Sequence, residues 1–287
     1  MRPFDLVEPA TLEEAFHLLE GDDPAVRPIG GGTALMLMMK EQVFRPVRLV
    51  SLRHLAPQFG AISIDADHRM IRFGATTSFS ELEHSEVVAR HLPVVVRTMR
   101  TLANVRVRNV ATLGGNLAHA DPHLDLPPVW IALGAQIVIE NPAGPRIVPA
   151  EDIFEGYYET NLRHDDIIRE IRVPLNASQR ASYVKITTRS AHDWPALGIA
   201  VRLEMKGGLA HHPRIVLSAA TNKPTRLVRT EALAHGQPIT PASLRELGEA
   251  AVSEADIASD SRGSADYKKH LLRVHLGRAL HALALGE

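Results

Sequence analysis

The sequence predicts a mixed α/β protein built from two domains. A length of 287 residues, of which 45% are hydrophobic, is enough for two separate cores. Apolar residues repeat with the period of a helix over residues 12–19 and alternate with polar ones over residues 167–173. After residue 180, three strand-like segments precede two apolar stripes with helical spacing. Helices and strands are therefore mixed in the first part and segregated in the second.

The N-terminal part alternates helices and strands. Thr11 lies three residues before Glu14, which is the spacing of a capping box, so we expect a helix over residues 12–19. A short strand is expected over residues 26–29, and helix-like apolar spacing resumes over residues 34–40. Further strands are expected at residues 48–52, 62–64, 70–75, 138–139 and 147–149, and further helices from residue 77 and over residues 93–102. Residues 130–139 are an apolar segment that ends in one of these strands.

The C-terminal part begins after a polar boundary at residues 176–180. Before it, the alternation over residues 167–174 predicts a half-buried strand that closes the first domain. Beyond it, strands are expected at residues 182–187, 196–205 and 214–220, and they suggest an antiparallel sheet. From Pro241 onward the pattern is helical, and the final stripe packs either on that sheet or on a partner.

Composition excludes several classes of function. Thirty-two basic and 33 acidic side chains leave a net charge of −1, so bulk charge recruits neither nucleic acid nor an anionic membrane. No run approaches the about 18 apolar residues of a membrane span, and the N-terminus has no apolar signal core. A cytoplasmic location is the resulting expectation.

The chain contains no cysteine. It therefore has no thiolate ligand for an iron–sulfur cluster, no disulfide, no cysteine nucleophile and no sulfur through which a flavin could be attached. If the chain belongs to a redox enzyme, any such cluster is bound by another chain.

Two glycine runs are the most informative motifs. Gly30, Gly31 and Gly32 form the first, and Gly114 with Gly115 forms the second. Without a Cβ atom, consecutive N–H groups can converge on an oxyanion, so two such runs suggest a ligand with two phosphates or one pyrophosphate held from both sides. The alternative is that each run is only a turn. Neither run fits the dinucleotide G-x-G-x-x-G or the P-loop pattern, so a Rossmann domain or a P-loop is unsupported.

The surroundings of these runs resemble a known family. Residues 29–35 with Met38-Met39-Lys40, and residues 110–116 with Asp121-Pro122 and residues 125–128, look like the two flavin-binding signatures of the medium, FAD-binding subunit of molybdenum hydroxylases. This is the group of xanthine dehydrogenase and aerobic carbon monoxide dehydrogenase. The resemblance covers essentially the whole chain, including residues 183–185, 189–193 and 260–271. The second loop is the more specific of the two.

The resemblance implies a particular α+β fold. Residues 1–176 would form a two-subdomain FAD-binding unit of the vanillyl-alcohol-oxidase/PCMH type, with subdomains at about residues 1–56 and 57–176. Residues 177–287 would form a C-terminal domain like that of the carbon monoxide dehydrogenase flavoprotein, an antiparallel sheet with helices.

The resemblance also implies a site for non-covalent FAD. The pyrophosphate would be held by the backbone of two segments, namely Ile29, Gly30, Gly31, Gly32, Thr33, Ala34 and Leu35, and Thr112, Leu113, Gly114, Gly115 and Asn116. Asp125 matches a FAD-contacting aspartate, Lys185 a lysine near the flavin, Ile168 an apolar backbone contact and Leu102 an apolar neighbour of the cofactor. Ala34 stands where relatives often carry a polar side chain, so a side-chain hydrogen bond is lost there. No side chain of this chain would act as a catalytic acid, base or nucleophile.

The expected function is that of an electron-transfer subunit. Partner chains, an iron–sulfur small subunit with 2Fe–2S clusters and a molybdopterin large subunit, would deliver electrons to FAD here, in an arrangement compatible with a dimer of heterotrimers. One alternative is a stand-alone FAD-binding protein for cofactor handling or maturation, and a third possibility is an independent flavin oxidase. The alternation of His119, Asp121, His123 and Asp125 superficially resembles a metal site if the segment is an extended strand. The adjacent prolines and the flavin-loop resemblance favour a structural and cofactor-binding role instead.

Overall fold

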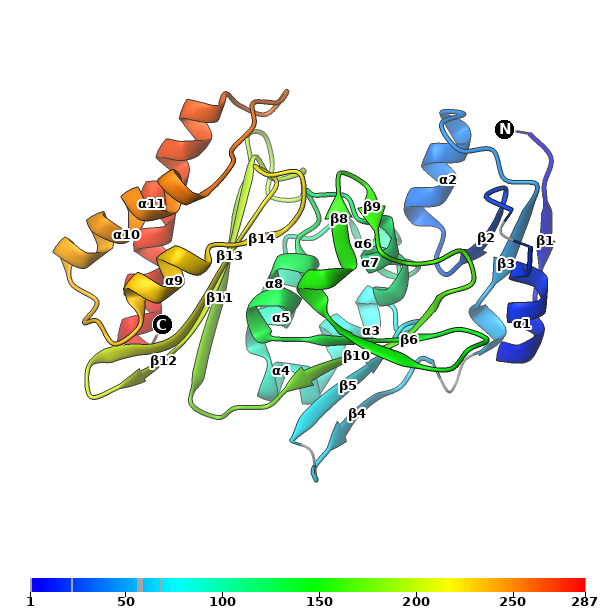
Figure 1. Cartoon of the computed structure of the whole chain (residues 1–287), viewed down its shortest axis with the longest axis horizontal. Coiled ribbons are helices and arrows are strands. Elements are labelled where there is room, and N and C mark those ends of the chain that lie inside the picture. Colours follow the sequence, from blue (N-terminus) through cyan, green and yellow to red (C-terminus); the bar gives the residue numbers. More distant parts are fainter. Residues whose placement is uncertain (1, 22, 56–58, 68, 287) are drawn as a thin grey trace.

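The computed structural model describes residues 2–21, 23–55, 59–67 and 69–286. Figure 1 shows a small N-terminal lobe, a central sheet with helices, and a C-terminal sheet covered by helices, arranged in this order along the long axis. The expected subdomain boundary at residues 56–57 lies outside the described residues. No described helix has the length and apolar character needed to cross a membrane.

The N-terminal lobe is a parallel sheet with two helices. Its strand order is β1-β3-β2, and the strands are β1 (Asp5–Val7), β2 (Val26–Ile29) and β3 (Arg48–Ser51). The helices are α1 (Leu12–Leu19) and α2 (Thr33–Lys40), and a 3-10 turn, η1 (Arg53–Leu55), follows β3. Helix α1 confirms the predicted start, since Thr11 Oγ1 accepts from the Glu14 N–H and the Glu14 carboxylate accepts from the Ala10 N–H. Its apolar face packs on Val50 of β3.

The central unit is an antiparallel sheet of order β4-β5-β10-β6-β7. Its strands are β4 (Ile62–Asp65), β5 (Met70–Gly74), β6 (Gln136–Glu140), β7 (Arg146–Pro149) and β10 (Ile167–Pro174). The helices around it are α3 (Phe79–His84), α4 (Glu86–His91), α5 (Pro93–Met99), α6 (Val105–Arg108), α7 (Leu113–His119) and α8 (Leu126–Leu133). A turn, η2 (Ala150–Ile153), leads into the hairpin β8 (Phe154–Gly156) and β9 (Glu159–Thr160).

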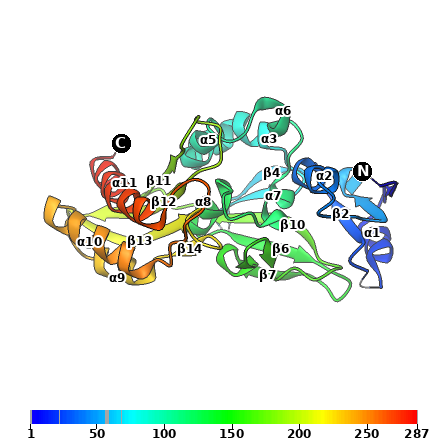
Figure 2. The ribbon, with the colours of Figure 1, turned by 90° about the horizontal axis from the view of Figure 1, so that it is seen from above.

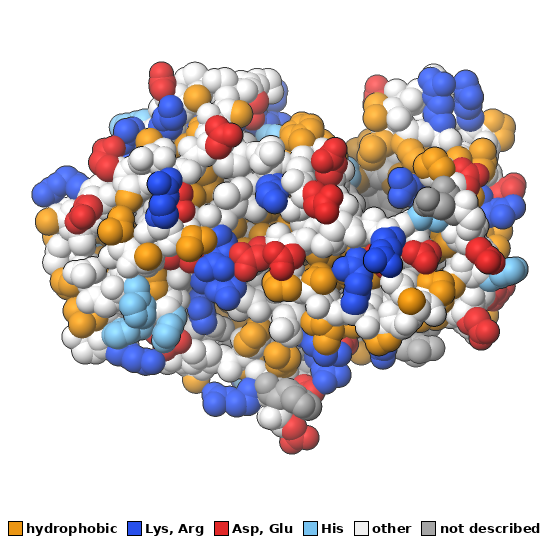
Figure 3. Space-filling view, viewed as in Figure 1, with side chains coloured by type: hydrophobic (Ala, Val, Ile, Leu, Met, Phe, Trp, Pro, Cys, Tyr) orange, Lys and Arg blue, Asp and Glu red, His pale blue; other side chains and the backbone are white. Residues whose placement is uncertain are grey.

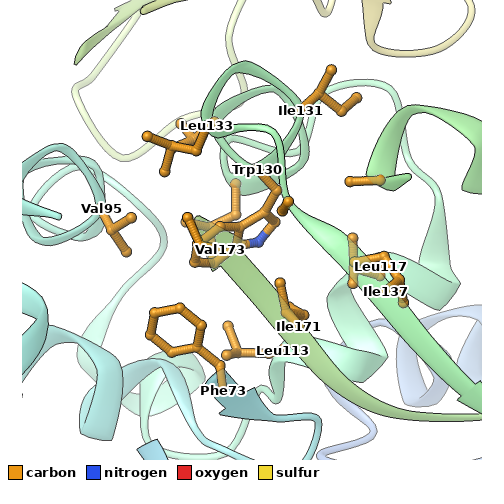
Figure 4. Close-up of a cluster of buried hydrophobic side chains, with 14 of the residues drawn as sticks. Phe73, Val95, Leu113, Leu117, Trp130, Ile131, Leu133, Ile137, Ile171 and Val173 are labelled. Carbon is orange, nitrogen blue, oxygen red and sulfur yellow. The ribbon is translucent and has the colours of Figure 1, made fainter. Parts of the chain in front are cut away.

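Helix α8 is the centre of the main core. All eight of its residues are buried, and the Trp130 ring lies 5.4 Å from the Phe73 ring of β5. Figure 4 shows Trp130 among side chains of β5, β10 and α5. The sequence predicted an apolar segment at residues 130–139 that ends in a strand at residues 138–139; the structure has that strand as β6, from Gln136, but also a helix from Leu126 that was not predicted. A helix buried on every side has no amphipathic period, which is why the pattern did not reveal it.

The C-terminal unit is an antiparallel sheet of order β11-β12-β13-β14 with three helices. Its elements are β11 (Gln179–Ile186), β12 (Leu197–Lys206), β13 (Leu209–Ser218), β14 (Thr225–Arg226), α9 (Val228–Ala234), α10 (Pro241–Glu254) and α11 (Ala265–Leu285). Figures 1 and 2 show the helices on the side of this sheet that faces away from α8. Ile199 and Val201 belong to the core beneath these helices, while Ala200 and Val216 join the core around α8. The predicted final stripe thus packs on the sheet of its own chain.

Candidate functional site

The two glycine runs lie against each other in the structure. The first connects β2 to α2, and the second begins α7. A Cβ atom on Gly30 would lie 2.5 Å from Thr112 Oγ1, and one on Gly31 would lie 1.8 Å from the Val110 carbonyl oxygen. Gly31 therefore lies against the backbone of the second loop and Gly30 against the side chain of Thr112, and a Cβ atom at residue 31 would prevent this approach. Figure 3 shows a notch between the lobe that carries α2 and the rest of the molecule.

Helix α2 begins without a capping side chain. Its N-cap residue, Gly32, has φ 68°, and no side chain accepts a hydrogen bond from the first turn. That turn also carries no acidic residue. The N–H groups of Thr33, Ala34 and Leu35 have no partner within the helix, and the helix dipole makes this end positive. Ile29 and the residues up to Leu35 are partly exposed, so this helix start is open to an anion.

The second glycine run is the first turn of α7 and not a free loop. Thr112 is the N-cap, and its Oγ1 accepts from the Gly115 N–H at 3.2 Å. Gly114 allows the helix to approach the chain after β5, because its Cβ would lie 2.8 Å from that of Ala75. Leu113 is buried in the core, whereas Gly115 is exposed. Asn116 is 9% exposed, and its buried Oδ1 has no hydrogen-bond partner among the described residues.

Asp125 at the start of α8 meets Lys185 of β11. Lys185 Nζ lies 2.9 Å from Asp125 Oδ2 and 3.0 Å from the Thr101 carbonyl oxygen. The Tyr183 hydroxyl donates to Asp125 Oδ1 at 2.7 Å. Burial raises the pKa of Asp125, and the charge and hydrogen bond of Lys185 and the hydrogen bond of Tyr183 oppose that rise. Burial and the neighbouring Asp125 charge raise the pKa of Tyr183, so the phenol stays protonated and remains a donor.

Leu102 follows Thr101, whose carbonyl group accepts a hydrogen bond from Lys185, in the turn after α5. Its side chain is buried. Arg108 Nη1 donates to the Leu102 carbonyl at 3.1 Å and to the Ala103 carbonyl at 2.8 Å, and Arg108 Nε lies 2.9 Å from Glu83 Oε2. The turn is thus held on one side by Lys185 and on the other by Arg108.

Backbone hydrogen bonds connect the strand segment at Ile168 to the second glycine run. Ile168 is buried in β10 beside a bulge between residues 168 and 170. The next carbonyl, that of Arg169, accepts from the Ala75 N–H, and the Ala75 carbonyl accepts from the Gly114 N–H, each at 2.8 Å. Two backbone hydrogen bonds therefore connect this part of β10 to the start of α7.

Sequence reasoning did not single out Tyr183 or Arg108 as site residues. A signal for Tyr183 exists, because residues two apart on a strand face the same side and Lys185 follows it at that spacing on β11. Arg108 offers no comparable signal, since its bonds to the turn at Leu102 depend on the tertiary packing of α6 beside that turn.

The segment from His119 to Asp125 is not an extended strand. His119 ends α7, and Ala120 follows in the left-handed conformation with φ 51°. Asp121 accepts from the Tyr158 hydroxyl at 2.6 Å and lies 3.0 Å from His123 Nδ1, and these hydrogen bonds hold its pKa below the usual value despite the burial that opposes them. The described residues contain no group of three His, Cys, Asp or Glu side chains suited to a metal ion. A cavity of about 760 Å³ beside α1 and His164 is lined by none of the residues of the glycine runs.

Comparison with known proteins identifies the family. Residues 2–176 match the family described as FAD binding domain in molybdopterin dehydrogenase, and residues 182–283 match the carbon monoxide dehydrogenase flavoprotein C-terminal domain. The carbon monoxide dehydrogenase medium chain of Hydrogenophaga pseudoflava is 32% identical, with 97% of this chain and 96% of that protein covered. The glyceraldehyde dehydrogenase medium chain of Sulfolobus acidocaldarius is 28% identical, with 98% of each chain covered.

A solved structure agrees over the full length. The carbon monoxide dehydrogenase of Hydrogenophaga pseudoflava, in a form that lacks the molybdenum-pyranopterin moiety, contains a chain that superimposes with a TM-score of 0.93 at 33% identity, covering 98% of both chains. Sequence, both domain families and the fold therefore agree. The chain belongs to the family of FAD-binding medium subunits of molybdenum-containing dehydrogenases.

Proposed function

We propose that this chain binds FAD where its two glycine runs meet and uses it to pass electrons from iron–sulfur clusters on a partner chain to a final acceptor. The observation that supports the site is the close approach of Gly31 to the Val110 backbone and of Gly30 to the Thr112 side chain. A pyrophosphate placed there would meet the uncapped start of α2 and the glycine-rich first turn of α7. Helix starts of this kind bind phosphate groups through their N–H donors and the helix dipole.

The remaining polar groups of the site also fit a dinucleotide. Asn116 has a buried carbonyl oxygen without a partner, and such an atom suits a donor from a ligand such as a ribose hydroxyl. Leu102 and Ile168 are buried apolar residues, and each would offer the cofactor an apolar neighbour. The side chain of Ala34 has no polar atom, so this position would contribute only its N–H.

The protein supplies binding and electrostatics, while the redox chemistry is that of FAD, which accepts electrons singly and releases them in pairs. Lys185 places a positive charge between Asp125 and the turn at Thr101, where it would favour negative charge on a bound ring. We assign no side chain of this chain the role of substrate acid, base or nucleophile.

The proposed partners follow from the relatives. We infer an assembly with an iron–sulfur small subunit and a molybdopterin large subunit, as a heterotrimer that can pair into a dimer, located in the cytoplasm. The absence of cysteine supports the assignment of the clusters to another chain. We also propose that residues 1–176 form the FAD-binding domain and residues 177–287 the C-terminal domain, with the linker between β10 and β11 as the boundary.

The first test is the absorption spectrum of the purified chain. We expect a flavin spectrum, and denaturation should release close to one FAD per chain. Copurification with cluster-bearing chains, and reduction of the flavin through them, would separate an electron-transfer subunit from a stand-alone FAD-handling protein. A colourless chain that also takes up no added FAD would contradict the proposal.

A further inference from the structure

Asp125 lies at the start of α8 but does not cap the helix. Positions 127 and 128 are prolines, which have no N–H to offer, and no side-chain capping bond is present. Its two carboxylate oxygens are instead engaged by β11, one by Tyr183 and the other by Lys185. A carboxylate that is only 5% exposed thus receives its donors from the C-terminal sheet.

Lys185 has one donor that the protein does not use. An ammonium group carries three N–H donors, and the described residues supply two acceptors, Asp125 Oδ2 and the Thr101 carbonyl. The Lys185 side chain is only 7% exposed, so an unused donor there is costly. The third donor is therefore available to a ligand beside the turn at Leu102.

The Tyr183 hydroxyl lies in a space that exists because residue 198 is glycine. A Cβ atom on Gly198 of β12 would lie 2.6 Å from this hydroxyl and 2.3 Å from Ser218 Oγ of β13. Residue 198 must therefore be glycine if both hydroxyl groups are to remain. Of these two hydroxyl groups, that of Tyr183 contacts Asp125, and that of Ser218 lies beside Tyr183 and acts to lower the pKa of the phenol.

We propose that Tyr183 is a positioning residue for the flavin, because its hydroxyl holds the Asp125 carboxylate that in turn orients the Lys185 ammonium. The inference rests on the proposed FAD site and extends it by one residue that does not itself touch the cofactor. Two residues of β11 then contact the Asp125 carboxylate. Tyr183 donates a hydrogen bond that fixes the position of the carboxylate, and Lys185 is the cation that the carboxylate orients.

The proposal predicts a specific pH dependence. The charged or titratable groups that act on Asp125 are Lys185 and Tyr183, both on β11, while β12 and β13 present Gly198 and Ser218, and the turn after α5 presents the Thr101 carbonyl. Protonation of Asp125 removes its attraction for Lys185. Because Tyr183 stabilises the ionised carboxylate, its loss raises the pKa of Asp125 further, and the lysine loses its partner at a higher pH.

The test is the affinity of the full-length chain for added FAD, measured by flavin fluorescence from neutral pH down to the lowest pH at which the chain stays folded. In Tyr183→Phe we expect the affinity to fall on the acid side, with this fall displaced upward by about one to two pH units relative to the wild type. Ser218→Ala removes a hydroxyl that acts on Tyr183 and not on Asp125, so it should displace the fall less than Tyr183→Phe does. Asp125→Asn should bind weakly at every pH, and adding Tyr183→Phe to it should change the profile no further.

Other outcomes would overturn the inference. A Tyr183→Phe variant whose affinity is unchanged, or is lowered by the same factor at every pH, would show that the hydroxyl only fills space. If that variant does not fold, Asp125→Asn alone tests the inference. A fall of FAD affinity at low pH that is the same in Asp125→Asn as in the wild type would contradict the role of the carboxylate. A wild-type chain that takes up no FAD, alone or in its complex, would refute both the proposed function and this inference. If the wild type binds FAD but Tyr183→Phe has the same dependence of affinity on pH, the inference alone is refuted.

Discussion

Single residues of the site are constrained by backbone contact more than by side-chain chemistry. Gly31 faces the Val110 carbonyl, and Gly114 faces Ala75, at distances where a Cβ atom does not fit. Leu113, in the same motif, is buried in the core, so in the proposed site it would offer only its backbone. Lys185 differs, because the structure shows its charge and its hydrogen bonds engaged with Asp125 and the Thr101 carbonyl. The two kinds of residue therefore respond differently to substitution.

Gly31→Ala should separate the two loops. The added methyl group would meet a backbone carbonyl, which cannot move aside as a flexible side chain can. We expect the bound FAD per chain to fall sharply and the free energy of unfolding to drop by about 1–3 kcal/mol, the usual cost of overpacking. Chromophore content and thermal denaturation measure the two effects.

Gly277→Ala is the matched control for that substitution. It lies within α11, and the nearest atom to its Cβ would be 3.9 Å away, so there is room for the methyl group. We expect unchanged FAD content and a gain of about 0.5–1 kcal/mol, since alanine favours a helix interior over glycine. Full FAD content in Gly31→Ala would contradict the close contact of the loops.

Among the elements, the two helices that begin at the glycine runs start in different ways. Helix α7 has a threonine N-cap, whereas α2 has glycine and no capping side chain. Capping satisfies one N–H group within the protein, and the uncapped start leaves its donors to a ligand or to water. In the proposed site, the start of α7 would be held by its threonine cap, while the start of α2 would offer unpaired N–H donors to the ligand.

Thr112→Ala and Thr240→Ala remove equivalent caps from different helices. Thr112 caps α7 at the site, and Thr240 caps α10 in the C-terminal unit, each through a hydrogen bond from the backbone three residues on. Each variant should lose about 1 kcal/mol of unfolding free energy. Only Thr112→Ala should weaken FAD binding, as measured by titration. Equal FAD affinities in the two variants would show that the α7 start plays no part in the site.

At the scale of the whole molecule, the central and C-terminal units share one core. Ala200 and Val216 of the C-terminal sheet pack with α8, and Tyr183 lies against the same cluster. Polar contacts add to this surface: Arg226 Nη1 lies 3.0 Å from Glu151 Oε1, and Lys223 Nζ donates to the Phe154 carbonyl at 2.9 Å. A site that draws Asp125 from one unit and Lys185 from the other requires this docking.

The shared core predicts cooperative unfolding of these two units. Separating them would expose α8, which is buried on all sides, so neither should melt first. Scanning calorimetry of the full chain should show one transition that includes both units, and residues 1–176 expressed alone should aggregate or bind a hydrophobic dye. Two resolved transitions for these units, or a stable and monomeric 1–176 fragment, would contradict this expectation.

The sequence by itself determined the elements whose pattern is local. Helix α1 has its cap and apolar stripe within nine residues, and β10 has its alternation within eight, so neither needs the rest of the chain to be recognised. The zero count of cysteines and the two glycine runs likewise pointed to a phosphate-bearing cofactor without a cluster on this chain.

Only the tertiary structure decided what depends on neighbours distant in sequence. It turned residues 113–119 into a helix and buried α8 completely. It also brought Tyr183 and Lys185 onto Asp125 across 58 and 60 positions of sequence. A buried helix has no periodic pattern, and a buried ion pair has no local signature, because both are stabilised by groups from other elements. The likeness of the motifs to a family predicted a set of cofactor-binding residues, and the packing of the central and C-terminal units determines how these residues lie relative to one another.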